Sequence, residues 1–343
     1  MAIKKSELYS TLWKCCDELR GGMDASQYKD YVLVILFVKY ISDKSRNDSN
    51  FMIDIPAGCY FEDFVALKGH ANIGEEMNKK MAALSEANQL DGVFIADFDD
   101  ETKLGKGKDK VETLSGLISI FQTSDLDFSK NRAADDDLIG DAYEYLMTMY
   151  ASNAGKSGGE FFTPADVSEL LTRLGTVGKK EINKVYDPAC GSGSLLLKAE
   201  KVLGRDAVRN GFFGQEINIT TYNLCRINMF LHDIEFDKFD IACEDTLTNP
   251  QHWDDEPFEL IVSNPPYSIK WAGDENPLLI NDPRFAPAGV LAPKSKADLA
   301  FIMHSLAWLA SNGTAAIVCF PGIMYRGGAE QKIRKYLVDN NFI

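Results

Sequence analysis

The residues best suited to take part in a reaction are Asn264-Pro265-Pro266-Tyr267. They follow the apolar run Leu260-Ile261-Val262 and one serine. An ordinary turn favours Gly, Asn or Asp and has no need of two consecutive prolines followed by an aromatic ring. Tandem prolines stiffen the backbone, so polar acceptors beside them are preorganised. The tetrapeptide therefore predicts a rigid site with a ring for stacking, although a plain rigid connector would have the same prolines.

A second candidate site is the glycine-rich stretch Asp187-Pro188-Ala189-Cys190-Gly191-Ser192-Gly193-Ser194, which follows an apolar run and precedes a helix-like segment. Glycines let a ligand approach the backbone, and a helix N-terminus offers free N–H groups. No GK[ST] follows as in a P-loop, and Leu196 stands where the dinucleotide motif has its third glycine. A tight strand-to-helix turn is the plain alternative.

Acidic residues end the next two strand-like segments. Glu216 follows GFFGQ, and an acid at that position can accept both hydroxyl groups of a ribose. Ile217 can pack on an adenine face, and Asp245, after FDIACE, can accept from the adenine amino group. Each acid would also be ordinary at a strand end, but the glycine-rich turn one strand earlier favours a ligand containing a nucleoside.

These candidate sites need elements that bring them to one place. From about residue 184, short apolar segments alternate with helix-length ones, as in an α/β fold with a parallel sheet covered by helices. Ligands bind beyond the carboxyl ends of the strands in such sheets, so all the candidate sites are expected on one rim. The expected strands are KVYDP, GFFGQE, FDIACED, FELIVSNPPY and TAAIVCFP, and the expected helices cover SLLLKAEKVL, Leu224 to Met229, 299–309 and 329–338.

The first part of the chain is predicted to be a helical domain over residues 1–137, ahead of a catalytic domain over 138–343. Asp24 can cap a helix through the apolar run 31–38, and the charged, glycine-interrupted residues 97–110 are predicted to form a loop. Apolar residues recur at helical spacing in two further segments: Leu8, Leu12, Cys15, Cys16 and Leu19, and then Leu114, Leu117, Ile118 and Phe121.

In order and spacing, DPACGSG, Glu216, Asp245 and NPPY resemble the S-adenosylmethionine-dependent amino-methyltransferases. Gly159-Glu160-Phe161-Phe162-Thr163-Pro164 matches a further motif of that family, which packs on the methionine end of the cofactor. With LIGDAYEYL and the helical N-terminal part, the chain resembles the modification (M) subunit of type I restriction–modification systems as far as about Leu337. The resemblance implies a Rossmann-like class I methyltransferase domain that binds S-adenosylmethionine through Glu160, Phe161, Phe162, Thr163, Pro164, Asp187, Ala189, Gly191, Ser192, Gly193, Ser194, Glu216, Ile217 and Asp245.

The implied reaction is methylation of adenine N6 in DNA. That nitrogen is a poor nucleophile because its lone pair is delocalised into the ring. The resemblance assigns the Asn264 side-chain oxygen and the Pro265 carbonyl to its two N–H groups, Pro266 to stiffening the turn, and Tyr267 to stacking on the flipped base. Cytosine N4 stays open as the target, although Asn as the first residue favours adenine. Cytosine C5 has no candidate thiolate, because the chain contains no Pro-Cys dipeptide.

Residues 268–298 lack an obvious helix or strand pattern, and a stretch of this length is usually functional or disordered. One hypothesis makes it part of a channel for the target strand, and a mobile surface loop is the alternative. In the channel hypothesis the phosphate contacts are Lys270, Arg284, Lys294 and Lys296, with Trp271 or Phe285 near the base.

Charge and composition limit the partners. A net charge of −15 argues against a protein that grips DNA over its whole surface. The family implies a separate specificity subunit for DNA recognition, a restriction subunit and a second copy of this chain. Seven scattered cysteines, no h-region and no apolar run of membrane-spanning length predict a cytoplasmic protein without a disulfide scaffold. The four histidines form no metal-binding pattern. The chain stops in what reads as the start of a further strand, so we expect its C-terminal part to be missing.

Three other functions compete with this interpretation. Protein-glutamine methyltransferases also use NPPY, but GEFFTP and the long helical N-terminal part speak against them. A non-catalytic assembly module would suit a shortened chain but leaves the complete NPPY unexplained. A nicotinamide dehydrogenase is disfavoured by Leu196, which replaces the third glycine.

Overall fold

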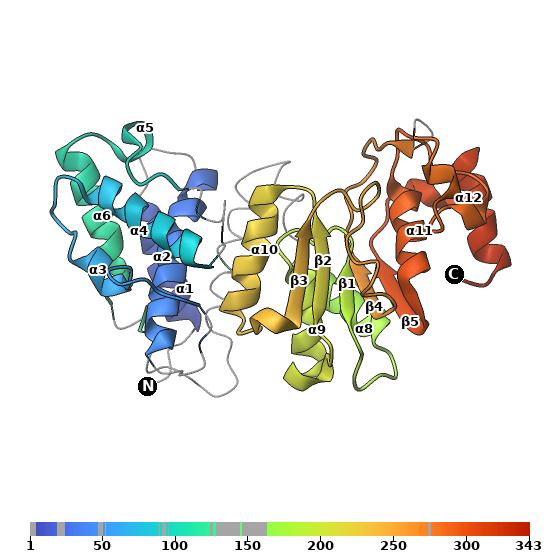
Figure 1. Cartoon of the computed structure of the whole chain (residues 1–343), viewed down its shortest axis with the longest axis horizontal. Coiled ribbons are helices and arrows are strands. Elements are labelled where there is room, and N and C mark those ends of the chain that lie inside the picture. The colour runs from blue at the N-terminus through green and yellow to red at the C-terminus, as the bar shows by residue number, and fades with distance from the viewer. Residues whose placement is uncertain are drawn as a thin grey trace. The chain divides into compact units, whose positions relative to one another are not determined.

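The computed structural model describes residues 5–18, 25–46, 51, 53–88, 90, 94, 96–123, 126–127, 145, 163–273 and 276–343 (Figure 1). The chain divides into two compact units, and each is described by itself. The first comprises Met1–Phe162 with Ile227–Phe236, and the second comprises Thr163–Arg226 with Asp237–Ile343. Within the described ranges, no helix is both long and apolar enough to span a membrane.

The described part of the first unit is helical, as the sequence predicts. Its helices are α1 (Lys5–Glu18), α2 (Ala25–Ser45), α3 (Phe61–Val65), α4 (Ile73–Asn88), α5 (Glu101–Leu104) and α6 (Lys108–Phe121) (Figure 1). Every side chain from 31 to 38 is buried, which explains why this stretch of α2 is apolar on all sides. The loop predicted for 97–110 is wrong in part, because Asp100 caps α5 by accepting from Thr102 N at 2.8 Å. The proposed cap Asp24 lies outside the described residues.

The second unit contains a five-stranded parallel sheet in the order β3-β2-β1-β4-β5, which confirms the predicted fold class. The strands are β1 (Val185–Asp187), β2 (Phe212–Glu216), β3 (Phe239–Cys243), β4 (Phe258–Ser263) and β5 (Leu309–Ile317). The helices are α8 (Ala165–Gly175), α9 (Ser194–Leu203), the first part of α10 (Ile219–Leu231), α11 (Asp298–Trp308) and α12 (Ala329–Asp339) (Figure 1). From Ile227 onward, α10 belongs to the first unit. From β1 the chain builds the sheet to one side through β2 and β3, and then to the other through β4 and β5. The ligand-binding crevice of such a sheet is expected at this switch point, between β1 and β4.

Both faces of the sheet are covered, which explains the nearly continuous apolar strands. On one face, Tyr186, Phe213, Phe258 and Ile261 pack around Trp308 of α11. On the other face, α8 comes so close that a Cβ on Gly175 would lie 2.3 Å from Leu260 Cδ1. A side chain at position 175 would therefore have to displace the Leu260 side chain.

The segment that follows NPPY is folded where it is described. It contains the short 3-10 helices Leu279–Asn281 and Ala286–Ala288. Five of its side chains join α11 in one buried cluster, namely Leu279, Phe285, Leu291, Ala292 and Ala297. The segment therefore has a small core of its own, and the sequence pattern missed it because its apolar residues are irregularly spaced.

The channel hypothesis is wrong for two residues of this segment. Arg284 is 1% exposed and lies in an ion pair with Asp282, with 2.8 Å between Nη2 and Oδ2. It also donates to Thr246 O at 2.7 Å and to Leu247 O at 2.8 Å. The guanidinium group is therefore buried and paired inside the protein, and it cannot contact a DNA phosphate. Phe285 is equally buried and cannot reach a base, whereas Lys270 and Lys294 are exposed.

Candidate active site

The glycine-rich turn connects β1 to α9 at the predicted rim. Gly191 has φ 54° and Gly193 has φ 81°, in the left-handed region that glycine adopts without a Cβ clash. Gly191 N donates to Glu216 Oε2 at 3.1 Å, so the turn is tied to the end of the neighbouring strand β2. Ser192 and Ser194 are buried beside these glycines. The backbone of the turn is therefore fixed in shape.

Glu216 is held on both sides of its carboxylate. Its second oxygen, Oε1, accepts from Asn218 N at 2.8 Å. Burial raises the pKa of Glu216, while the backbone hydrogen bonds oppose that shift. Ile217, which follows it, is 69% exposed. The half-buried Glu216 carboxylate suits the two hydroxyl groups of a ribose, and the exposed Ile217 side chain suits an aromatic base.

Asp187 has an unusual environment at the end of β1. It is fully buried, and Oδ1 accepts from Ala189 N at 3.0 Å and from Ser263 Oγ at 2.7 Å. The other oxygen, Oδ2, is buried without a hydrogen-bond partner. Burial raises the pKa of Asp187 to about 7. Because an unpaired buried carboxylate oxygen is costly, it marks a place where a ligand N–H or ammonium group fits.

Asp245 lies in the loop after β3 and already accepts two hydrogen bonds from that loop. Oδ1 accepts from Leu247 N at 2.9 Å and Oδ2 from Thr248 Oγ1 at 2.8 Å. These bonds are those of a turn-forming aspartate. They leave further lone pairs on the carboxylate, so the predicted contact with an adenine amino group stays a prediction.

Two residues that sequence reasoning missed fix this loop against the sheet. Buried Gln215 donates from Nε2 to Glu244 O at 3.1 Å and to Asn249 O at 3.0 Å. Thr246 Oγ1 donates to Pro188 O at 2.6 Å, which ties the loop to the glycine-rich turn. The only sequence signal was a polar residue inside the apolar strand β2.

The NPPY turn begins directly after β4, beside β1. Asn264 Nδ2 donates to Thr163 Oγ1 at 3.3 Å, and Asn264 Oδ1 accepts from the Tyr267 hydroxyl group. Pro265 is buried and Pro266 exposed, while the Tyr267 ring is 44% exposed. The asparagine is thus half-buried with a fixed amide orientation, and the ring is free to stack.

The structure brings most of the predicted site residues to one rim. Asp187, Gly191, Glu216 and Asn264 all lie at or just beyond strand ends in the order β2, β1, β4. Thr163 and Pro164 lie directly before α8. Glu160, Phe161 and Phe162 lie outside the described residues, so their part in the site stays a prediction. Ser263 was missed, although it stands directly before NPPY and links β4 to Asp187.

Two protein families match the chain. Residues 134–343 match the family described as N-6 DNA Methylase, and residues 8–121 match the HsdM N-terminal domain. The chain is 44% identical to the type I restriction enzyme MpnII methylase subunit of Mycoplasma pneumoniae, over 97% of this chain and 71% of that protein. It is 29% identical to the MjaVII methylase subunit of Methanocaldococcus jannaschii, over 99% of this chain and 61% of that protein.

A solved structure agrees with these matches. The methyltransferase subunit of a type I restriction–modification system from Streptococcus thermophilus superposes with a TM-score of 0.85 at 30% identity. The match covers 98% of this chain and 79% of that one. The family expected from NPPY, DPACGSG and the helical N-terminal part is thereby confirmed. The chain belongs to the N-6 DNA methylase family, together with the methylase subunits of type I restriction enzymes.

Proposed function

We propose that this chain transfers a methyl group from S-adenosylmethionine to N6 of an adenine in DNA, as the modification subunit of a type I restriction–modification complex. The observation that carries the proposal is the meeting of NPPY with Asp187 at neighbouring strand ends, through the bond from Ser263 Oγ to Asp187 Oδ1. The acceptors for a nucleophilic nitrogen and the polar groups for a cofactor thus flank one switch point. The membership in the N-6 DNA methylase family supports the choice of adenine N6.

The residues on the rim fit S-adenosylmethionine, which supplies a methyl group on an electrophilic sulfonium when it is bound. Asp187 Oδ2, buried and without a partner, would accept from the amino group of the methionine part. Glu216 would accept from the ribose hydroxyl groups, and exposed Ile217 would cover the adenine. Gly191 and Gly193 adopt positive φ and have no side chains that could cover this surface.

Asn264 and Pro265 would orient the target nitrogen. Two acceptors on its N–H groups favour a pyramidal nitrogen whose lone pair points outward, and this positioning is the main catalytic contribution. Thr163 supports the role of Asn264, because its hydroxyl group accepts from Nδ2 and leaves Oδ1 for the target. The Tyr267 hydroxyl group occupies Asn264 Oδ1 in this structure, so an arriving N–H must share or displace that bond.

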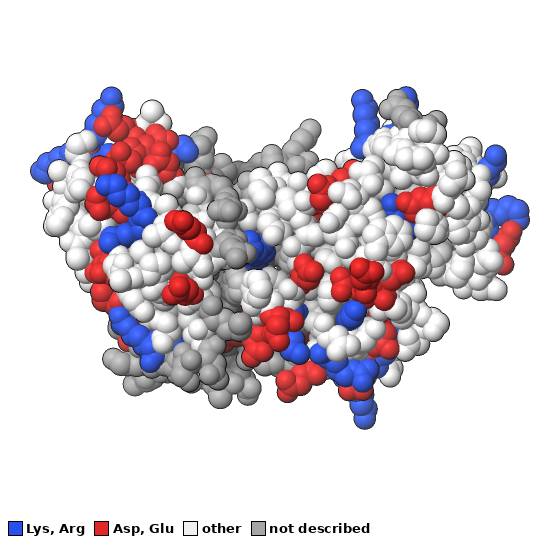
Figure 2. Space-filling model, viewed as in Figure 1, with Lys and Arg blue, Asp and Glu red and all other residues white. Residues whose placement is uncertain are grey.

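The partners follow from the relatives and from the charge. The relatives are methylase subunits of type I restriction enzymes, so DNA, a specificity subunit, a restriction subunit and a second copy of this chain are the expected partners. Figure 2 shows acidic and basic side chains interspersed on the face in view, which suits DNA recognition by another subunit. We assign residues 1–137 to the helical domain and 138–343 to the methyltransferase domain. We place the protein in the cytoplasm. The names of the relatives favour neither a glutamine methyltransferase nor an assembly module.

The test is a calorimetric titration of S-adenosylmethionine into the wild type, Glu216→Ala and Glu181→Ala. Glu181 is an exposed acid ahead of β1, at the opposite end of the strand from the rim, and serves as the control. We expect binding in the wild type and the control and none in Glu216→Ala. Methylation of adenine in DNA, assayed with an added specificity subunit, should then be lost in Asn264→Ala while cofactor binding persists. Equal binding by all three proteins would overturn the cofactor site.

A further inference from the structure

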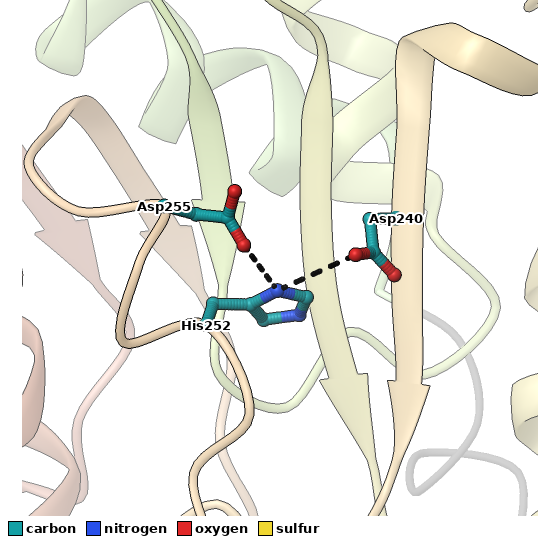
Figure 3. A group of neighbouring side chains, drawn as sticks. All are labelled: Asp240, His252 and Asp255. Carbon is teal, nitrogen blue, oxygen red and sulfur yellow. Dashed lines mark hydrogen bonds and ion pairs between the residues drawn. The ribbon is translucent and has the colours of Figure 1, made fainter.

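Away from the rim, three side chains bring their metal-binding atoms together. Asp240 lies on β3, and His252 and Asp255 lie in the connection from β3 to β4 (Figure 3). One ring nitrogen and one oxygen from each carboxylate lie within 4.8 Å of one another. We propose that Asp240, His252 and Asp255 form a binding site for a first-row divalent metal ion.

The hydrogen bonding of His252 provides the main argument. Its Nε2 lies 2.9 Å from Gly214 O, and because a carbonyl oxygen only accepts, Nε2 carries the proton. The other ring nitrogen, Nδ1, faces Asp255 Oδ2, 3.2 Å away, with Asp240 Oδ2 at 4.0 Å (Figure 3). These three atoms form one set of donors that a metal ion can bind together. Histidines that bind metals characteristically donate their other N–H to a carbonyl group in this way.

The fold holds this arrangement rigidly on the histidine side and leaves it open on the carboxylate side. His252 is 1% exposed, and its ring packs edge-on against Phe213 and Tyr186, with centroid distances of 5.5 and 5.9 Å. Asp240 pairs in register with Phe213, so both side chains project from the same face of the sheet. The side chains of Asp240 and Asp255 are 64% and 32% exposed, which leaves room for water as further ligands.

The residues around the three side chains carry charges of both signs. Asp254 and Glu256 flank Asp255 and are exposed. Lys184 is the nearby positive group, and its Nζ donates to the backbone oxygen of Asp255 at 2.5 Å while lying 5.2 Å from the centre of the Phe213 ring. Burial and the neighbouring Arg284 hold the pKa of His304 well below its usual range, so that imidazole adds no positive charge.

The donor set indicates which ions fit. Donors about 2.1 Å from a metal lie roughly 3 to 4 Å apart, close to the separations found here. An imidazole favours zinc, iron or nickel, and carboxylates favour manganese or magnesium, so the mixed set favours Mn²⁺ or Zn²⁺ over Mg²⁺. Asp240 is the second residue of β3, near the end opposite the rim. A bound ion would therefore clamp the β3–β4 connection to the sheet and take no part in methyl transfer.

The experiment titrates ZnCl₂, MnCl₂ and MgCl₂ by calorimetry into the whole chain after dialysis against a chelator. Asp240→Asn removes one exposed ligand, and Asp254→Asn is its matched control in the adjacent turn. We expect one Zn²⁺ or Mn²⁺ per wild-type chain, binding at least about tenfold weaker in Asp240→Asn and unchanged in Asp254→Asn. The absorption of added Co²⁺ should likewise differ between the two variants.

Two results would overturn the site. One is a wild-type chain that binds neither Zn²⁺ nor Mn²⁺, which would mean that a second ring proton on His252 faces the carboxylates instead. The other is equal metal binding by wild type and Asp240→Asn, which would place the ion elsewhere. Because the Asp240 side chain is exposed, its replacement by Asn leaves the fold available for either result.

Discussion

Asn264 Nδ2 donates to Oγ1 of Thr163, 101 residues earlier in the chain, at 3.3 Å. The resemblance assigned Thr163 to the cofactor, and that role stays a prediction. What the structure shows is its contact with the residue that is proposed to hold the target nitrogen. An asparagine amide has two similar ends, and only one of them can accept from an amino group. The threonine hydroxyl group binds the donating end, so the accepting end faces Tyr267 and the rim.

The first prediction concerns this orientation. Thr163→Val keeps the shape of the side chain but removes the acceptor, so the amide loses its fixed orientation. We expect kcat to fall by about 10- to 100-fold, the equivalent of one unsatisfied polar group, with the affinity for S-adenosylmethionine little changed. Thr163→Ser keeps the hydroxyl group and should retain most of the activity. A loss of cofactor affinity at unchanged kcat would instead assign Thr163 to the cofactor alone.

The second prediction separates the ring of Tyr267 from its hydroxyl group. The ring is 44% exposed, and the hydroxyl group donates to Asn264 Oδ1. Tyr267→Phe should keep the stacking surface and most of the activity, since it frees the oxygen that the target needs. Tyr267→Ala should lower activity by roughly 10- to 100-fold, because stacking of a base on an aromatic ring contributes about 1–3 kcal/mol. Steady-state methylation rates for both variants decide the matter, and equal loss in both would mean that the hydroxyl group itself is needed.

The sequence predicted that the candidate residues lie together because the carboxyl ends of parallel strands all lie at one edge of the sheet. It placed Asp187, Glu216 and NPPY correctly without any knowledge of side-chain contacts. It failed for Arg284, since an arginine in an irregular segment has the pattern of an exposed residue. What buries Arg284 is Asp282 together with two carbonyl groups from a loop that is 37 and 38 residues away, and no local pattern reports such contacts.

Local pattern also missed that Asp240 and His252 lie close together. The twelve-residue separation of Asp240 and His252 matches no metal motif, and they meet only because the connection after β3 folds back onto β2 at Gly214. The register of β2 with β3 then decides which face Asp240 occupies. Contacts that depend on strand register and on a returning loop are decided by tertiary packing, which composition and periodicity do not encode.

The third prediction follows from the burial of Arg284. Arg284→Ala leaves the Asp282 carboxylate and two carbonyl groups without their donor, so we expect a loss of about 3–5 kcal/mol in the free energy of unfolding. Urea denaturation measures this loss, and Lys294→Ala, an exposed residue of the same segment, is the control with little expected change. If Lys294 contacts a DNA phosphate, Lys294→Ala should lower the DNA affinity of the folded protein more than Arg284→Ala does. If Arg284→Ala were as stable as the wild type but bound DNA more weakly and with less salt dependence, Arg284 would contact a phosphate after all.

The fourth prediction uses the raised pKa of Asp187, which is about 7 in the folded protein because of burial and about 3.9 in an unfolded chain. Between these values the folded protein holds a proton that the unfolded chain releases. The resulting contribution to stability is complete below about pH 4 and is lost as the pH rises through about 7, with an upper bound of about 4 kcal/mol. Asp187→Asn should flatten this part of the stability profile, as measured by urea denaturation across the range.

Without a ligand, burial favours the protonated form of the Asp187 carboxyl group, and cofactor binding should favour the ionised form instead. An ammonium group at Oδ2 favours the ionised carboxylate, so it lowers the pKa and releases a proton on binding. We expect the calorimetric binding enthalpy of S-adenosylmethionine to depend on the ionisation enthalpy of the buffer at about pH 6, and this dependence to fade above about pH 8. Glu216 also has a raised pKa, so Asp187→Asn serves as the comparison that isolates one carboxyl group. A wild type without proton release at the lower pH would show that the ammonium group does not meet Asp187, and the buried oxygen would then need another donor.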